Sequence, residues 1–294
     1  MDTLVALVFM TGTRLPLLFI IFLGISLNGC TGLFFQPMKP LVRTPGDINL
    51  SYQDIHFTSQ DGTNLHGWFL PAEGKAHGTI LLLHGNAENI STHIGSVYWL
   101  PPRGFNVFLF DYRGYGQSAG NPDLQGAFQD IEAALLWLQN KPDIDPTRIV
   151  VLGQSLGGAM GTYVFANTGQ SEIIRALILD SVFSDYQQIV REKLASFWLT
   201  WPLQYPLSWL VTGKYSPTEA IGQYSPTPIL IIHNKNDAVI PAHHATQLFA
   251  HATPPKELWL MPEGRHIAAL NQPETRNRLV NYLLQILDNP TQHE

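Results

Sequence analysis

Six short apolar runs recur between residues 79 and 261, separated by polar or amphipathic stretches. Each run has four or five residues, and continuous apolar runs of this kind suit strands that are buried on both faces of a parallel sheet. Residues 124–138 place apolar side chains on one helical stripe, and residues 275–287 do the same. Repeated alternation of strand and helix predicts a doubly wound, mostly parallel α/β sheet, whose ligand crevice lies beyond the carboxyl ends of the strands. The predicted strands are residues 79–83, 106–110, 149–152, 176–179, 229–232 and 257–261.

Two segments depart from this alternation. Residues 55–58 and 65–70 flank the turn pair Asp61 and Gly62, a pattern typical of an N-terminal β-hairpin. Residues 184–226 form a long interval that is punctuated by prolines and holds large aromatic side chains at helical spacing. We expect a small, aromatic-rich lid insertion here, within one domain of residues 51–288 that is followed by a tail of residues 289–294. The aromatic side chains include Trp198, Trp201, Tyr205 and Trp209.

The N-terminus carries a second, separate signal. Residues 15–27 are apolar and follow Arg14, which is the layout of a secretory signal peptide. The run is shorter than the roughly 20 apolar residues of a membrane-spanning helix. The chain's one cysteine, Cys30, comes three residues after the run and has no partner for an internal disulfide.

The residues before this cysteine resemble the lipobox of bacterial lipoproteins, in which cleavage precedes the cysteine and its sulfur is lipidated. Leu27 and Gly29 match that pattern. The resemblance implies a signal peptide over residues 1–29, lipidation of Cys30 and a tether over residues 30–50. An uncleaved membrane anchor and an ordinary buried apolar segment are the alternatives.

Composition excludes several classes of function. The formal net charge is −6 and the chain holds 17 Lys and Arg residues, so it offers no basic face for nucleic acid. It contains no phosphate-binding Gly-x4-Gly-Lys loop, no His-Glu-x-x-His pair and no Cys-His cluster. We therefore expect no cofactor and no metal, and a small-molecule or acyl substrate.

A glycine-flanked serine follows the predicted strand 149–152. Residues 153–158 read Gly-Gln-Ser-Leu-Gly-Gly, and the residues after them favour a helix. This Gly-x-Ser-x-Gly pattern is typical of a nucleophile elbow, in which a tight strand-to-helix turn holds the serine hydroxyl out of the sheet. Ser155 is therefore the candidate nucleophile.

A serine hydroxyl needs a base and a group that orients the base. Of eleven histidines, His266 follows the last predicted strand, where it could reach over the crevice. His243, His244 and His251 are expected on a solvent-facing helix surface. The candidate acid is Asp237 after strand 229–232, with Asp180 after strand 176–179 as the competitor.

Acyl transfer also needs backbone N–H donors for the oxyanion of its transition state. Leu156, directly after the serine, is one candidate. The second lies in the loop after strand 79–83, where Asn86 is preferred and Ala87 is the alternative. His84 is expected to be a turn residue beside this site.

These stretches resemble the α/β-hydrolases, and within them the branch of Bem46-type membrane-associated serine hydrolases and bacterial lipoprotein relatives. The matching residues are 84–89, 111–118 and 153–158, together with Asp237 and residues 264–266. One departure is Glu88, because these relatives usually have glycine there. Residues 111–118 are interpreted as a structural turn that supports the crevice.

The resemblance implies a membrane-anchored serine hydrolase that cleaves carboxylic esters or thioesters through an acyl-enzyme. A peptidase of the same fold and a non-catalytic envelope binding or scaffold protein are the alternatives. By resemblance to Gram-negative lipoproteins, Thr31 after the cysteine implies the outer membrane of a bacterial cell envelope over the inner one, with the domain facing the periplasm. We expect the lid aromatics either to pack on the domain or to line an acyl pocket.

Overall fold

The computed structural model describes residues 34–288. The predictions of a signal peptide, of Cys30 lipidation and of a tail at residues 289–294 fall outside the described residues. Among residues 34–288, no helix combines the length and the apolar character needed to cross a bilayer.

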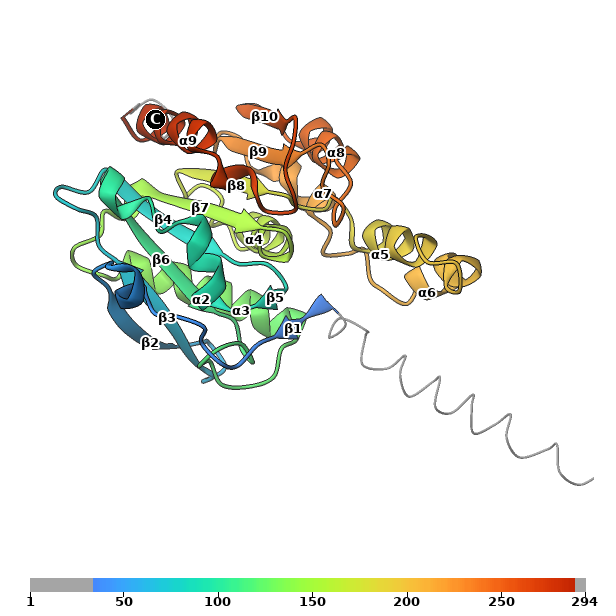
Figure 1. Cartoon of the computed structure of the whole chain (residues 1–294), viewed down its shortest axis with the longest axis horizontal. Coiled ribbons are helices and arrows are strands. Elements are labelled where there is room, and N and C mark those ends of the chain that lie inside the picture. The colour runs from blue at the N-terminus through green and yellow to red at the C-terminus, as the bar shows by residue number, and fades with distance from the viewer. Residues whose placement is uncertain (1–33, 289–294) are drawn as a thin grey trace, which may run out of the picture.

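An eight-stranded sheet forms the centre of the domain, in the order β10-β9-β8-β7-β4-β6-β3-β2 (Figure 1). All neighbouring pairs from β10 to β6 are parallel, whereas β2 and β3 join by antiparallel pairing. The predicted mostly parallel sheet and the N-terminal hairpin are therefore confirmed. The strands are β2 (Gln53–Thr58), β3 (Asn64–Leu70), β4 (Gly78–Leu83), β6 (Phe105–Asp111), β7 (Ile149–Gln154), β8 (Ala176–Asp180), β9 (Ile229–Asn234) and β10 (Lys256–Met261).

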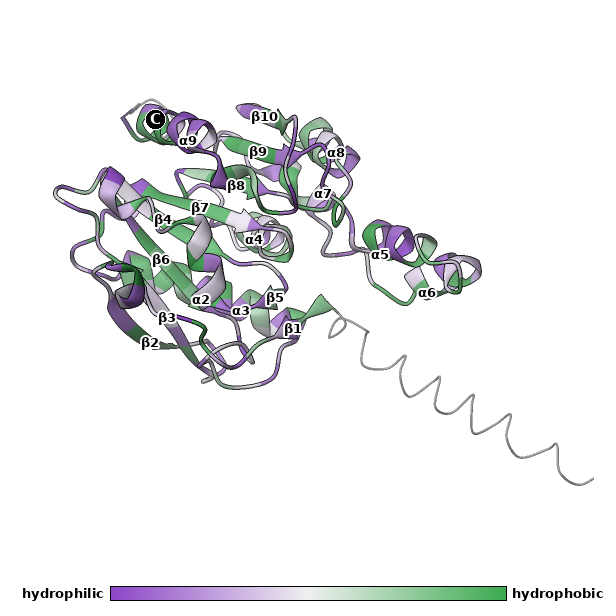
Figure 2. Ribbon diagram, viewed as in Figure 1, coloured by the Kyte–Doolittle hydropathy of each residue, from purple (hydrophilic) through white to green (hydrophobic). Residues whose placement is uncertain are grey.

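Helices cover both faces of this sheet because successive strand residues point to opposite sides. Leu81 and Leu83 of β4 join one hydrophobic core with α3 (Leu124–Gln139), α4 (Leu156–Asn167) and α8 (His243–His251). Ile80 and Leu82 join the other core with α2 (Ile90–His93) and α9 (Pro273–Asp288). Figure 2 shows hydrophobic residues concentrated in the central strands, and polar residues in the edge strand β2 and at the start of β10.

The chain order of the strands creates a switch point between β4 and β7. From β4 the chain adds β6 on one side of the sheet and then returns to add β7 on the other side. Loops that leave the carboxyl ends of two such strands diverge and open a crevice, which is where ligands bind in sheets of this kind.

The shorter elements connect the strands or form the insertion. The lid contains α5 (Tyr186–Ala195) and α6 (Gln204–Ser208), which project from one side of the domain (Figure 1). The segment forms several short helical pieces, which is consistent with the prolines that punctuate it. The other elements are β1 (Gln36–Pro37), β5 (Ala87–Glu88), α7 (Pro217–Ala220), η2 (Pro45–Ile48), η3 (Ile94–Ser96), η4 (Pro101–Arg103), η5 (Pro146–Arg148), η6 (Trp201–Leu203), η7 (Ile221–Gln223) and η8 (Ala269–Asn271).

The segment expected to be a tether instead packs on the domain from Phe34 onward. Its strand β1 pairs in parallel with β5, and Phe35 is buried. The side-chain amide of Asn89 donates to the backbone oxygens of Met38 and Pro40, at 2.9 Å each. These contacts satisfy backbone groups and bury an aromatic ring, so the segment belongs to the folded unit.

Glu88 shows why its position favours glycine. Its φ is 68°, in the left-handed region, and its side chain is exposed. A side chain costs about 1 kcal/mol in this backbone conformation. We expect Glu88→Gly to have a free energy of unfolding about 1 kcal/mol higher than Glu88→Ala, measured by urea denaturation.

Glu73 is the matched control for this pair of variants. It is also an exposed loop glutamate, but its φ is not positive. Glu73→Gly should therefore have a lower free energy of unfolding than Glu73→Ala. If the glycine variant had the lower free energy of unfolding at both positions, the left-handed conformation of residue 88 would be wrong.

Candidate active site

Ser155 lies in the tight turn between β7 and α4. Its φ of 48° and ψ of −119° fall outside the regions that L-residues ordinarily adopt. Its N–H donates to the backbone oxygen of Asp180 at 3.0 Å, which ties the turn to the end of β8. A strained residue of this kind costs about 1–3 kcal/mol and persists only where the surroundings enforce it, most often at functional sites.

The flanking glycines are required by close backbone approaches. A Cβ on Gly153 would collide with the backbone of Gly158, four residues after the end of β7. A Cβ on Gly157 would collide with the backbone oxygens of Leu83 and His84 at the end of β4. The glycines thus let α4 start directly against β4, and this contact fixes the turn that carries Ser155.

Asp237 and His266 form a hydrogen-bonded pair at the same edge of the sheet. Asp237 follows β9 and His266 follows β10, and Nδ1 of the histidine lies 2.7 Å from Oδ2 of the aspartate. The other carboxylate oxygen accepts the N–H groups of Val239 and Ile240, at 2.8 and 2.9 Å. Burial alone would raise the pKa of Asp237, but the bond to His266 and the two backbone N–H groups lower it below its ordinary value. Asp237 therefore remains ionised.

Asp180, the competing acid, contacts different groups. Its carboxylate accepts from the amide of Gln154 at 3.1 Å and from the hydroxyl of Ser181 at 3.4 Å. Burial raises the pKa of Asp180 to about 6, against the opposing effect of Gln154. Among the described residues, the carboxylate hydrogen-bonded to His266 is that of Asp237.

Two further strained residues, Ser181 and Ile267, position the loop that carries His266. Ser181 and Ile267 have φ values of 57° and 56°, and for a β-branched residue such as isoleucine this is a rare conformation. The N–H of Ile267 donates to Oγ of Ser181 at 3.2 Å. This bond links the residue after His266 to the end of β8. The hydrogen bonds of the described residues do not include one between Ser155 and His266, and such bonds often form only when substrate is present.

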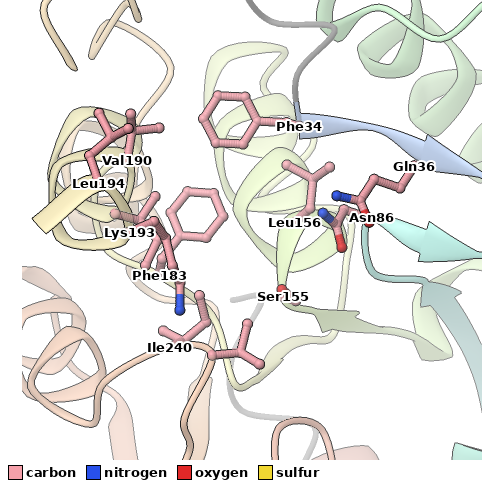
Figure 3. A pocket seen from close by; sticks show the side chains of 12 residues that line it. Phe34, Gln36, Asn86, Ser155, Leu156, Phe183, Val190, Lys193, Leu194 and Ile240 are labelled. Carbon is pink, nitrogen blue, oxygen red and sulfur yellow. The ribbon is translucent and has the colours of Figure 1, made fainter. Parts of the chain in front are cut away.

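The candidate oxyanion donors lie beside Ser155. Asn86 and Leu156 line the same pocket as the serine, one from each side of the switch point (Figure 3). The backbone oxygen of Asn86 accepts from the Tyr115 hydroxyl at 2.6 Å and from the N–H of Gln36 at 2.9 Å. The N–H of Asn86 is in none of the hydrogen bonds formed within residues 34–288. That donor is thus available, and the loop that carries it is held in place.

The pocket over Ser155 has a volume of about 360 Å³ and a mainly apolar lining. Side chains reach it from the elbow, from α5, from the loop after Asp237 and from the N-terminal segment (Figure 3). Its size and lining fit a small ligand with an apolar part. The lining residues are Phe34, Gln36, Asn86, Ser155, Leu156, Phe183, Ile189, Val190, Lys193, Leu194, Val239 and Ile240.

Comparison with known proteins identifies the family. A family model of the alpha/beta hydrolase fold matches residues 78–201. The alpha/beta hydrolase domain-containing protein WAV2 of Arabidopsis thaliana is 34% identical over 236 residues, which are 76% of this chain and 75% of WAV2. The chain belongs to the α/β-hydrolase family.

Other relatives agree with this assignment. The uncharacterized protein YfhR of Escherichia coli K12 is 39% identical over 81% of this chain and 82% of its own length. Protein bem46 of Schizosaccharomyces pombe is 29% identical over 74% of this chain and 71% of its own length, which confirms the resemblance to Bem46-type proteins. The solved structure of the Pyrococcus furiosus esterase Pf2001 shares the fold, with a TM-score of 0.69 and 22% identity over 86% of this chain and 97% of the esterase.

The lid tryptophans of this α/β hydrolase were expected either to pack on the domain or to line an acyl pocket, and they do neither. Trp198, Trp201 and Trp209 are 77%, 59% and 70% exposed, and none of them lines the pocket. Helical spacing placed them on a common segment but could not show what that segment packs against. The lid side chains that do line the pocket belong to α5.

Two groups of side chains outside the pocket have the residue types of a metal site. Glu192 lies 3.0 Å from His243 and 3.1 Å from His244. However, Nδ1 of His244 accepts the backbone N–H of Ser184 at 3.1 Å, so its proton resides on Nε2 and points at Glu192. This group is therefore satisfied by hydrogen bonds without an ion. The second group is Asp54, His56 and His66, in the hairpin.

Several other expectations are settled by burial. His244 was expected to face solvent with its neighbours but is buried, and burial lowers its pKa. His84 is buried beside the oxyanion loop, where its Nδ1 lies 2.7 Å from the oxygen of Gly85. Residues 111–118 have the structural role expected of them, because Asp111 accepts the N–H of Ile90 at 2.9 Å and the hydroxyl of Ser118 donates to the backbone oxygen of Asp111 at 2.6 Å.

Two pocket residues, Phe34 and Gln36, were missed because the segment before residue 51 has no clear periodicity. The adjacent aromatic pair Phe34 and Phe35 is the one signal that could have revealed them, since exposed linkers rarely contain such pairs.

Proposed function

We propose that this α/β hydrolase cleaves carboxylic esters or thioesters, with Ser155 as nucleophile, His266 as general base and Asp237 as the group that orients the histidine. The observation that carries the proposal is the strained Ser155 turn opening into an apolar pocket. The hydrogen-bonded Asp237–His266 pair at the same sheet edge supports it.

The proposed reaction proceeds in two halves. His266 takes the proton of the Ser155 hydroxyl as the oxygen attacks the carbonyl carbon, and it then gives that proton to the leaving alcohol or thiol. Water attacks the resulting acyl-serine, His266 takes the water's proton, and the carboxylic acid and the free serine are released. The ionised Asp237 accepts from Nδ1–H of His266 and stabilises the imidazolium that forms in each half.

Backbone donors supply the second part of the proposed catalysis. The N–H groups of Leu156 and Asn86 would receive the negative charge that develops on the carbonyl oxygen. Each donor of this kind is worth on the order of 10²–10³ in rate. The bonds from Tyr115 and Gln36 to the Asn86 oxygen support this assignment, because they fix the loop before substrate arrives.

Labelling with a fluorophosphonate tests the proposal directly. Such a probe phosphonylates a serine whose hydroxyl is activated by a base, and mass spectrometry locates the adduct. We expect a single adduct, on Ser155. Labelling at another residue, or none under conditions in which the protein is folded, would contradict the proposed nucleophile.

The two alternative functions have less support. A peptidase that recognises a peptide terminus needs charged anchors, and Lys193 is the one charged side chain among the residues that line the pocket. A non-catalytic scaffold would have no reason to retain a strained serine beside an aspartate–histidine pair.

The pocket lining supports a preference for apolar acyl groups. Each buried methylene contributes about 0.8 kcal/mol, which is roughly a fourfold gain in kcat/KM. We expect kcat/KM on p-nitrophenyl esters to rise from acetate to a medium-chain acyl group. Ile189→Phe, which fills part of the pocket, should end the rise at a shorter chain.

Leu136→Ala provides the control for this profile, because Leu136 is exposed on α3 and lies outside the pocket. It should keep the wild-type dependence on chain length. A wild-type profile that falls steadily from acetate would indicate a small or polar substrate instead.

We further propose that lipidation of Cys30 anchors the domain at a bacterial envelope membrane, with the outer membrane favoured and the domain facing the periplasm. The lipobox-like residues before the cysteine support this. Cys30→Ser should abolish incorporation of a palmitate analogue and leave the precursor uncleaved, as measured by metabolic labelling and gel mobility. Unchanged labelling in this variant would contradict the lipoprotein assignment.

A further inference from the structure

The lid carries the largest gathering of exposed aromatic side chains in the described part of the chain. Residues 197–209, here named the lid tip, run from the end of α5 through η6 and α6. Trp198 and Trp209 are 77% and 70% exposed. Single exposed apolar residues are ordinary, but a contiguous group of them marks an interaction surface. The exposed side chains are Phe197, Trp198, Leu199, Trp201, Leu203 and Tyr205, with Trp209.

The charge pattern around the lid tip is characteristic of a lipid interface. Residues 194–213 contain no Asp, Glu, Lys or Arg, although charged residues make up 14% of the chain. Lys193 and Lys214 border this uncharged run, and Arg191 lies two residues before Lys193; none of the three forms an ion pair among residues 34–288. The nearby acid, Glu192, is turned to the histidines of α8. Tryptophan and tyrosine prefer the level of the lipid headgroups, and basic residues beside them attract anionic lipids.

The start of the described chain lies beside the same lid. Phe34 lines the pocket, and its ring packs against those of Phe183 and Tyr186, at 6.5 and 5.1 Å between centroids. Figure 1 shows β1 on the side of the domain from which α5 and α6 project. Only three residues separate Cys30 from Phe34, so the two residues lie at most about 14 Å apart. A lipid on Cys30 would therefore hold this side of the domain close to the bilayer.

We infer that the lid tip is a membrane-docking surface, whose aromatic side chains insert into the headgroup region of a phospholipid bilayer. The uncharged aromatic run supplies the insertion, and Arg191 and Lys214, near its two ends, meet anionic headgroups. A lipid surface accounts for three exposed tryptophans together with flanking cations, whereas a second copy of this chain would bring like charges together.

Docking also has a consequence for substrate access, and this consequence rests on the proposed hydrolase function. Helix α5 lines the pocket with Ile189, Val190 and Leu194 and leads directly into the lid tip. A docked lid tip thus brings the pocket to the membrane surface. Esters with an acyl chain embedded in the bilayer then reach Ser155 without crossing water.

Depth-dependent quenching tests the docking surface without any assay of activity. In the full chain carrying Cys30→Ser, a single cysteine is introduced as Trp198→Cys and labelled with an environment-sensitive fluorophore. The matched control is Leu136→Cys, which is 54% exposed on α3. The labelled chains are reconstituted into phosphatidylcholine–phosphatidylglycerol vesicles, with and without brominated lipids.

Insertion predicts that brominated lipids quench roughly half or more of the emission at position 198 and less than about a tenth at position 136. Equal, weak quenching at both positions would overturn the docking surface. A blue shift of the fluorophore at position 198 in the absence of vesicles would also overturn the docking surface. If that blue shift depended on protein concentration, the surface would bind a second copy of this chain. If the blue shift did not depend on concentration, the surface would bind the chain's own N-terminal segment. Loss of esterase activity with retained quenching would contradict only the proposed function.

Discussion

Ser155→Ala is expected to lower kcat/KM for a p-nitrophenyl ester by roughly 10⁵–10⁶-fold. The loss is this large because alanine removes the atom that forms the acyl-enzyme, and the N–H groups of Leu156 and Asn86 stabilise only the charge around that bond. His266→Ala should cost a similar factor, since an unactivated hydroxyl is a weak nucleophile. The double variant should lose little more than either single one, because the two side chains act as a unit.

Steady-state kinetics with a folded protein is the measurement, and near-UV circular dichroism confirms the fold of each variant. Ser51→Ala is the matched control, because Ser51 is exposed before β2. It should retain wild-type activity. A Ser155→Ala protein with comparable turnover to the wild type would end the mechanism proposed here, whatever the cause of that turnover.

Much of this architecture could be predicted because the strands are buried on both faces. A strand such as residues 229–232 is apolar on both faces, so it can be recognised as a continuous apolar run. Strands of a parallel sheet that is covered on both faces have this composition. Once the strands are known, the positions that follow them fall at one edge of the sheet. Ser155, Asp237 and His266 could all be proposed on that ground, and the structure brings the last two within hydrogen-bond distance.

The remaining features depend on contacts between distant segments, which a local pattern does not encode. The helical spacing of the lid tryptophans was visible, but their exposure depends on where α5 and α6 project. His244 was placed correctly on a helix, yet its burial follows from packing against Ser184 in another loop. The N-terminal segment was interpreted as a tether because β1 has two residues and finds its partner β5 some 50 positions later.

The strained residues beside Ser155 were equally invisible in the sequence. Ile267 is a poor choice for a left-handed backbone, and nothing local explains it. Its N–H bond to Ser181, itself strained, links two loops 86 positions apart and fixes the chain that carries His266. The backbone preferences of these residue types do not predict their conformations, because contacts within the site enforce the strained backbone.

Asp237→Asn is expected to lower kcat/KM by about 10⁴-fold, and Asp180→Asn by less than about tenfold. The oxygen of an asparagine at position 237 would keep accepting the N–H groups of Val239 and Ile240, so its amide nitrogen would face Nδ1 of His266. That nitrogen donates, which forces the histidine's proton onto Nε2 and leaves it unable to take the proton of Ser155.

At position 180 the same substitution changes much less. The pKa of Asp180 is about 6 because the group is buried, so near pH 6 a large fraction of it is already neutral, as an amide is. An asparagine oxygen can still accept from Gln154, the contact that Asp180 makes at 3.1 Å. Steady-state rates of the two variants on one ester, compared at pH 6, therefore decide which strand supplies the acid. If Asp180→Asn proved the more damaging change, the orienting carboxylate would belong at the end of β8, and the Asp237–His266 bond would have to break before the reaction begins.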